Sequence, residues 1–134
     1  MARAVMFGVA SACVAAAVGT TFPAKAQRPA LDMLSHLSAG QWELRIRETG
    51  AIQRMCLGNR MRLIQIRHPD LDCNSIVVED SLNSVTVQYT CRGRGYGRTH
   101  IRRETGQLVQ IESQGIADGR PFEFSAEGRR VSDC

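Results

Sequence analysis

The sequence predicts a mainly β fold of the α+β kind: a curved, partly rolled antiparallel meander of about seven strands with two short helices. Short segments that alternate apolar and polar residues recur along the chain, as half-buried strands do. Turn residues separate these segments at hairpin spacing, and Asp118-Gly119 is the strongest such pair. No segment alternates strand with helix in the way that indicates a parallel sheet.

Residues 1–26 are expected to be a secretory signal peptide. Arg3 provides the positive start, an apolar run extends from Ala4 to Val18, and Ala24-Lys25-Ala26 forms a small-x-small cleavage site. The apolar run is shorter than the ~20 residues that span a bilayer as a helix, so an uncleaved membrane anchor is the less favoured interpretation. The chain is therefore expected to be exported to the periplasm of a Gram-negative bacterium, with secretion as the alternative.

Removal of this segment changes the charge of the chain. The whole sequence has a formal net charge of +4, but loss of Arg3 and Lys25 leaves 15 arginines against 13 acidic residues, a net charge of +2. Such a weakly charged surface provides little of the electrostatic attraction that nucleic-acid binding needs, so no nucleic-acid partner is expected. All basic residues after residue 26 are arginines. This fits either recognition of anions or a coding bias towards arginine, and the even spread of the arginines along the chain favours the coding bias.

One short helix is expected before the β domain and a second one within it. The first lies in the N-terminal segment of residues 27–39, where Pro29 precedes leucines at helical spacing (Leu31, Leu34 and Leu37). The second is expected to start after Asn59, a good N-cap residue, and to end near Arg67, because Pro69 follows.

Residues 40–134 are expected to form a single antiparallel β domain. In its first strand Trp42, Leu44 and Ile46 lie on one face, and Glu43, Arg45 and Arg47 lie on the other. The seven expected strands are 41–48, 51–57, 76–79, 85–91, 96–103, 107–115 and 121–130. A domain of this size has a modest core, so covalent links are expected to matter for its stability.

Four cysteines remain after the signal peptide takes Cys13 with it: Cys56, Cys73, Cys91 and Cys134. An even number in a small exported chain predicts two disulfides, and the absence of a C-x-x-C spacing argues against zinc. If residues 81–83 form a three-residue loop with Asn83 in the left-handed region, Cys73 and Cys91 lie opposite each other across a hairpin. Cys56 then pairs with Cys134; the pairing Cys56–Cys73 with Cys91–Cys134 stays open as the alternative.

The stretch from Arg92 to Arg103 is the most suggestive for binding. Its interleaved arginines and glycines resemble a flexible RNA-binding tract, but export and the flanking alternation favour a hairpin loop. Arg98, His100 and Arg102 lie on one face of the following strand and could bind an acidic ligand. A loop over residues 104–106 would pair Ile101 with Val109 and leave these three side chains solvated. A two-residue turn would bury Arg102 against Val109, at the cost of an unpaired buried charge.

No recognised catalytic motif is present, and neither a cofactor nor a metal is expected. The three histidines are far apart in the sequence and lack metal-ligand spacing. His68 with Asp70 and Asp72 could hold a metal, but Pro69 and the two acids also suit an ordinary loop after a helix. No residue is therefore assigned a catalytic role.

Several of these features together are similar to a known family. The signal peptide, the opening Gly40-x-Trp42-Glu43-Leu44, Cys56-Leu57, the spaced Cys73 and Cys91 and the terminal Asp133-Cys134 resemble the domain of unknown function 3617 family of small exported bacterial proteins. The resemblance covers residues 39–134, with Ala39 where a proline is common. It implies an exported, disulfide-bonded protein with no established activity and no catalytic residues to carry over.

The function expected from these observations is that of a non-enzymatic binding module or envelope-associated protein. The alternative is a carrier of a small molecule or lipid on the concave face of the sheet, with an acidic or apolar ligand. A hydrolytic enzyme is the third and least favoured class, since it needs a cluster of acid, base or nucleophile that no motif indicates.

Overall fold

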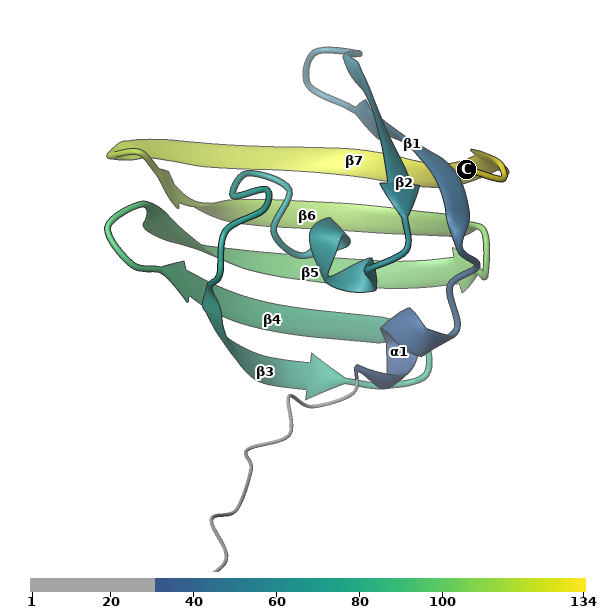
Figure 1. Ribbon diagram of the computed structural model, residues 1–134, viewed down its shortest axis with the longest axis horizontal. Helices are drawn as coiled ribbons and strands as arrows, with labels where there is room; N and C mark the ends of the chain where they lie inside the picture. Colours follow the sequence, from purple (N-terminus) through teal and green to yellow (C-terminus); the bar gives the residue numbers. More distant parts are fainter. Residues whose placement is uncertain (1–30) are drawn as a thin grey trace, which may run out of the picture.

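The computed structural model describes residues 31–134, so the predicted signal peptide lies outside the described residues. Seven antiparallel strands form one sheet (Figure 1). The strands are β1 (Gly40–Ile46), β2 (Ile52–Leu57), β3 (Asn74–Asp80), β4 (Ser84–Cys91), β5 (Gly95–Thr105), β6 (Leu108–Ala117) and β7 (Arg120–Ser132). The predicted number of strands is confirmed. No helix in residues 31–134 is long and apolar enough to cross a membrane.

The order of the strands is not that of a simple meander. Strands β3 to β7 follow one another through hairpins, but β1 pairs with β7, and the sheet order is β2-β1-β7-β6-β5-β4-β3. The sheet is open, with β2 and β3 as its two edges, so the expectation of a partly rolled sheet is not confirmed. Local alternation specifies each hairpin, whereas the pairing of the first strand with the last depends on burial of Trp42 and Leu44, whose side chains are fully buried.

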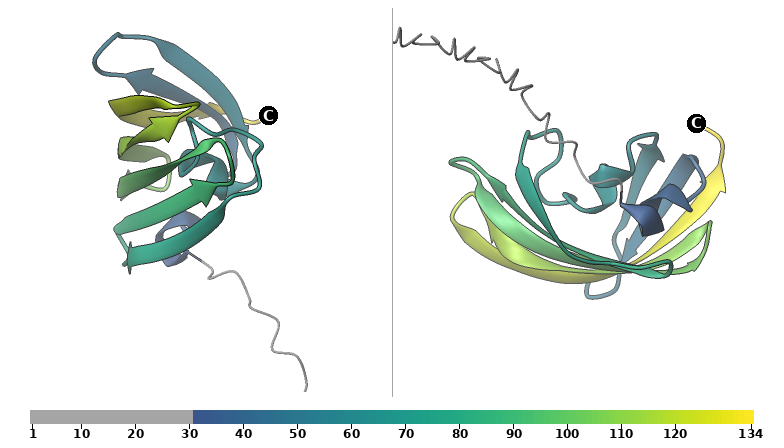
Figure 2. Two further views of the ribbon diagram at one scale, coloured as in Figure 1. Left: turned by 90° about the vertical axis from the view of Figure 1, so that its left-hand side faces the viewer. Right: turned by 90° about the horizontal axis from the view of Figure 1, so that it is seen from below.

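The sheet is curved, and the chain itself covers its concave side (Figure 2). We call this side the inner face and the opposite, solvent-facing side the outer face. Helix α1 (Asp32–Ser35) and the connection of residues 58–73, which leads from one edge of the sheet to the other, lie on the inner face. They bury an aliphatic layer against the strands, made of Met33, Leu34, Leu37, Leu63, Ile64 and Ile66.

The expectation of two short helices is not confirmed, because residues 31–134 contain one short α-helix and one 3₁₀ helix. Helix α1 has four residues, and the Asp80 carboxylate accepts hydrogen bonds from the backbone N–H groups of Asp32 and Met33 at its start. The second predicted helix, 59–67, is only a 3₁₀ helix, η1 (Arg60–Leu63), although Asn59 caps it as expected by accepting from Met61 N–H. The buried hydroxyl of Thr99 donates to the Ile64 carbonyl at 2.7 Å, so that a tertiary contact takes an acceptor that a continuing helix would use.

Two disulfides are present, Cys73–Cys91 and Cys56–Cys134, as the hairpin argument paired them. The predicted three-residue loop was wrong: residues 81–84 lie between the paired residues Asp80 and Val85, and Asn83 does not have a positive φ. A bulge between Val77 and Glu79 compensates for the extra loop residue. Asn74 therefore pairs with Thr90, and the two cysteines beyond them lie opposite each other.

The register of β5 and β6 differs from both predicted registers. Ile101 pairs with Ile111 rather than Val109, and the residues between the last paired positions are Gly106 and Gln107. A bulge between Arg103 and Thr105 separates this tight turn from the main ladder. The shift from the favoured register is two residues in total, which keeps every side chain on its predicted face.

Candidate functional site

The outer face of strands β4 to β7 carries polar side chains in cross-strand rows. One row, which we call the polar row, consists of Gln88, Arg98, Gln114 and Glu123, each directly paired with the next across the strands. The next row towards the β4–β5 loop includes Tyr96, Ile116 and Pro121, and we call it the apolar row. The registers of the three strand pairs thus place the four planar groups of the polar row beside the apolar row.

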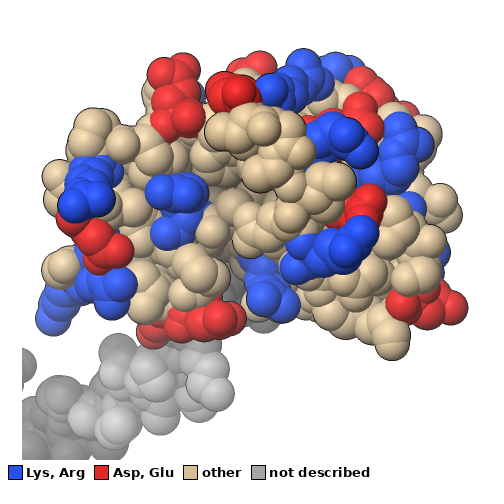
Figure 3. Space-filling view, turned by 90° about the horizontal axis from the view of Figure 1, so that it is seen from above, with Lys and Arg blue, Asp and Glu red and all other residues tan. Residues whose placement is uncertain are grey.

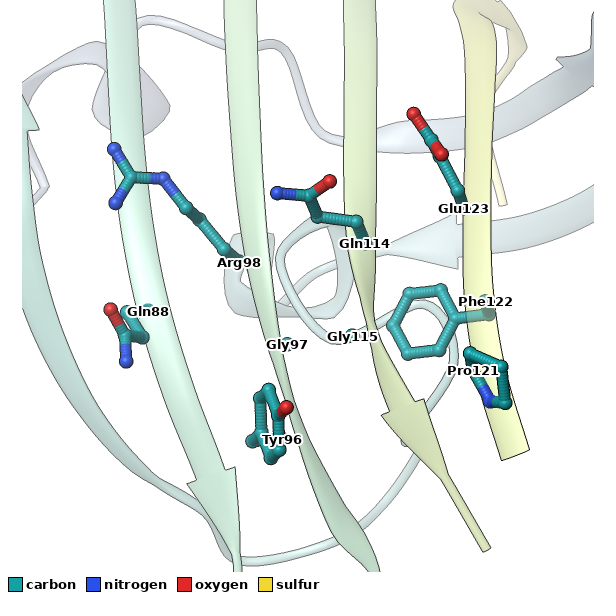
Figure 4. Close-up of a pocket in the computed structure, with 9 residues that line it drawn as sticks. All are labelled: Gln88, Tyr96, Gly97, Arg98, Gln114, Gly115, Pro121, Phe122 and Glu123. Atoms are coloured by element: carbon teal, nitrogen blue, oxygen red, sulfur yellow. The ribbon is translucent and has the colours of Figure 1, made fainter. Parts of the chain in front are cut away.

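A hollow of about 500 Å³ lies over these two rows, and we call it the outer-face hollow (Figure 4). All four residues of the polar row line it, together with Tyr96, Pro121 and Phe122, while Gly97 and Gly115 form its floor. A second hollow of about 390 Å³ shares Arg98, Gln114 and Glu123 with the first and extends to His100 and Glu112. Together they form a continuous site in the middle of the sheet.

The polar row is free of partners within the described part of the chain. None of its four side chains makes a hydrogen bond or ion pair with another residue of 31–134, and all four are exposed. Many charged groups elsewhere on this face are paired: Arg54 with Glu43 at 2.7 Å, Arg102 with Glu104 at 3.0 Å and Arg129 with Glu127 at 3.2 Å. The hydrogen bond from Arg129 lowers the pKa of Glu127. The polar row therefore keeps its full hydrogen-bonding capacity for a ligand.

Arg98, His100 and Arg102, the predicted basic column, lie together on the outer face of β5, but acidic residues interrupt their positive charge. His100 is half-buried, pairs across the strands with Glu112, and its Nδ1 lies 2.9 Å from the Thr86 hydroxyl. Arg102 is ion-paired with Glu104. Both signs of charge are also interspersed on the side of the molecule seen in Figure 3. The arrangement does not form a concentrated anion site.

His68, which the sequence offered as a metal ligand, lies buried on the inner face. Its Nδ1 is 3.1 Å from the Tyr89 hydroxyl and its Nε2 is 3.2 Å from the Arg94 carbonyl. Because the carbonyl can only accept, Nε2 carries the proton and Nδ1 accepts from the tyrosine. In residues 31–134 no group of three or more His, Cys, Asp or Glu side chains is placed to hold a metal ion.

Each of the two floor glycines lies where a Cβ atom would meet a neighbouring group. A Cβ at Gly97 would lie 2.5 Å from the Tyr89 hydroxyl, and a Cβ at Gly115 would lie 2.1 Å from the Tyr96 carbonyl oxygen. The Tyr89 ring, fully buried, takes the space beneath Gly97, and burial raises the pKa of its hydroxyl to about 12. Gly97, which the sequence placed in a hairpin loop, therefore lies in β5 and admits the buried Tyr89 ring, whereas Gly115 admits the close approach of the β5 backbone.

A further hollow, of about 320 Å³, lies between β2 and the connection of residues 58–73. Its apolar wall consists of Met55, Met61, Ile66 and Leu71, and Arg54 and Arg62 are among its polar residues. The side-chain nitrogen of Gln65, which also lines this hollow, is buried and has no hydrogen-bond partner. The connection of residues 58–73 covers much of the concave face (Figure 2), and this hollow beside β2 is the place near that face where a carrier could hold a ligand.

The sequence missed most of the candidate site. It singled out Arg98 and its neighbours on one strand, but not Gln88, Gln114 and Glu123, which come from three other strands. Their alternation placed them on polar strand faces, but only the pairing registers bring them into one row. Comparison of the chain with protein-family models, with curated proteins and with solved structures finds no match. The resemblance to the domain of unknown function 3617 family therefore stays a prediction.

Proposed function

We propose that this chain is an exported, non-enzymatic binding module of the bacterial envelope that holds its ligand in the outer-face hollow. The observation that carries the proposal is the polar row: four exposed planar groups from four strands that have no partner among the described residues. The strands fix the backbone positions from which these side chains project. Membership of the domain of unknown function 3617 family is part of the proposal and rests on the motifs quoted above.

Export to the periplasm fits the covalent structure. Two disulfides are typical of proteins that fold in an oxidising compartment, and the signal-like segment precedes them in the chain. Fractionation of a Gram-negative host that expresses the full chain tests this point. We expect the protein in the periplasmic fraction, with Gln27 as its first residue; recovery from the cytoplasm with an intact N-terminus would contradict it.

Sedimentation with isolated cell envelopes tests the binding role. We expect the wild-type protein to pellet with envelope material and a fourfold variant of the polar row, Q88A/R98Q/Q114A/E123Q, to stay in the supernatant. The variant R92Q is the matched control for Arg98, because it also removes one exposed arginine that has no partner among the described residues. Equal sedimentation of all three proteins would refute a role for the polar row, and failure of the wild type to pellet would refute binding to the envelope.

The hollow beside β2 supports a second candidate, a carrier of a small apolar acid. Its volume is at the lower end of the range for small-molecule sites, ~300–1,000 Å³, and methionines adapt readily to apolar ligands. The unpartnered amide nitrogen of Gln65 favours a ligand with an acceptor oxygen. Native mass spectrometry of protein purified from the periplasm tests it: a reproducible bound mass that Met61→Trp abolishes supports the carrier, and a mass without ligand for the wild type contradicts it.

A further inference from the structure

We infer that the ligand of the outer-face hollow is a neutral oligosaccharide. This inference rests on the proposed function and gives the chemical class of the ligand. The first reason is charge: the polar row has one guanidinium, one carboxylate and two amides, so its formal charges cancel. Glu112, which lines the adjoining hollow, has no ion pair among the described residues and would repel an anion.

The second reason is the mixture of donors and acceptors. Arg98 can only donate, Glu123 as a carboxylate can only accept, and Gln88 and Gln114 can each do both. A hydroxyl group also donates and accepts, so a ligand rich in hydroxyls can satisfy every member of the row. A phosphate or carboxylate could use only the donors and would leave the carboxylate of Glu123 facing a like charge.

The third reason is the apolar row beside these groups. Tyr96 is 50% exposed, Pro121 is exposed, and both line the hollow. In Figure 4 the ring of Tyr96 lies on one side of the two floor glycines, and Arg98, Gln114 and Glu123 lie on the other. A pyranose ring has C–H faces that can pack on such side chains and hydroxyls at its rim that can reach a polar row, and tyrosine is suited to contacts of this mixed kind.

The fourth reason is the place of the hollow in the sheet. A peptide that adds to a sheet uses the free backbone groups of an edge strand. The outer-face hollow instead lies over β4 to β7, which each pair with neighbours on both sides, so only side chains are available for recognition. The polar row crosses three strand spacings of about 4.8 Å, roughly 14 Å in all, which suits two or three linked sugar rings rather than a single small ion.

Nitrogen-15 NMR titration of the full chain tests the inference, because it detects weak binding and locates it. The probes are two neutral trisaccharides, maltotriose and the N-acetylglucosamine trimer, with trigalacturonate, inorganic phosphate and tetra-alanine as the acidic and peptide comparators. We expect at least one neutral trisaccharide to shift the resonances of β4 to β7 around the polar row. We also expect Q114A and R98Q to weaken its binding about fivefold or more, since each removes hydrogen bonds to the ligand.

The control variant R92Q is expected to bind the trisaccharide as the wild type does. Because the substituted side chains are exposed and make no hydrogen bond or ion pair within residues 31–134, all three variants should keep the thermal midpoint of the wild type, which separates lost binding from lost structure. If only the acidic probes or tetra-alanine shift these resonances, the oligosaccharide inference is overturned while the outer-face hollow stands as a binding site. If neither the trisaccharides nor the comparators shift them and the polar-row variant still sediments with envelopes, both proposals fail.

Discussion

Tyr89 gives the fold a dependence on alkaline pH. Burial raises the pKa of its hydroxyl from about 10 to about 12 in the folded protein. A raised pKa means that the folded state favours the neutral tyrosine. Its contribution to stability is therefore complete below pH 10 and is lost as the pH rises from 10 to 12. At 1.36 kcal/mol per pKa unit, the loss amounts to about 3 kcal/mol.

This chain allows an unusually direct measurement of that loss. The described residues contain no lysine and their cysteines are all in disulfides, so few groups other than the two tyrosines change charge between pH 9 and 12. In the variant Y96F, Tyr89 is the only tyrosine left, and the ultraviolet absorbance of tyrosinate reports its ionisation alone. We expect this absorbance to rise near pH 12, or earlier only where far-ultraviolet circular dichroism shows unfolding.

The variant Y89F provides the complementary test. It removes the O–H that donates to His68 Nδ1 and leaves that buried nitrogen unpaired, which should cost about 1–3 kcal/mol at neutral pH. Its stability to urea should then change less between pH 10 and 12 than that of the wild type. Half-ionisation of Tyr89 near pH 10 in a folded protein, or equal alkaline destabilisation of Y89F and the wild type, would refute the reasoning.

Three further predictions concern the fold. Gly97→Ala should lower the free energy of unfolding by about 1–3 kcal/mol, because its Cβ would lie 2.5 Å from the Tyr89 hydroxyl. Cys56–Cys134, which joins two exposed residues, should be reduced before Cys73–Cys91, in which Cys91 is buried; mass spectrometry after graded reduction and alkylation gives the order. Arg94→Gln should raise the pKa of Asp118, which hydrogen bonding and charge from Arg94 lower, so that NMR detects protonation of Asp118 at higher pH than in the wild type.

Each of these has a control in the same chain. A Cβ at Gly58 would meet no atom within 4 Å and the residue does not have a positive φ, so Gly58→Ala should leave stability nearly unchanged. Equal rates of reduction at the two disulfides would contradict the exposure argument. For Asp118, the control is Arg92→Gln, which removes an arginine two residues before Arg94 and leaves the hydrogen bond from Arg94 in place; an equal effect on the pKa would show that the contact with Arg94 is not its cause.

The strand faces could be predicted because they depend on nearest neighbours in the chain. Alternation placed Trp42 and Leu44 on the buried side of their strand, and Asp118-Gly119 forms the tight turn between β6 and β7 with both residues at positive φ. Loop lengths could not be predicted in this way, because β3 and β5 each have a bulge, and a bulge adds a residue that the alternation of apolar residues does not reveal. It also failed for η1, where a buried Thr99 from another strand competes for the helical acceptor.

The sequence by itself therefore determined the strands, the side of each strand that meets the core, and the residues available for the disulfides. Only the tertiary structure decided that β1 pairs with β7, that the connection of residues 58–73 fills the concave face, and that four polar residues from four strands form one row. The physical reason is that side chains alternate between the two faces of a strand with a period of two residues, so the local sequence decides the face. Strand order and register are instead those that give the whole core its lowest free energy. The candidate binding site lies in that second class, because each of its residues is polar and unremarkable until its neighbours across the sheet are known.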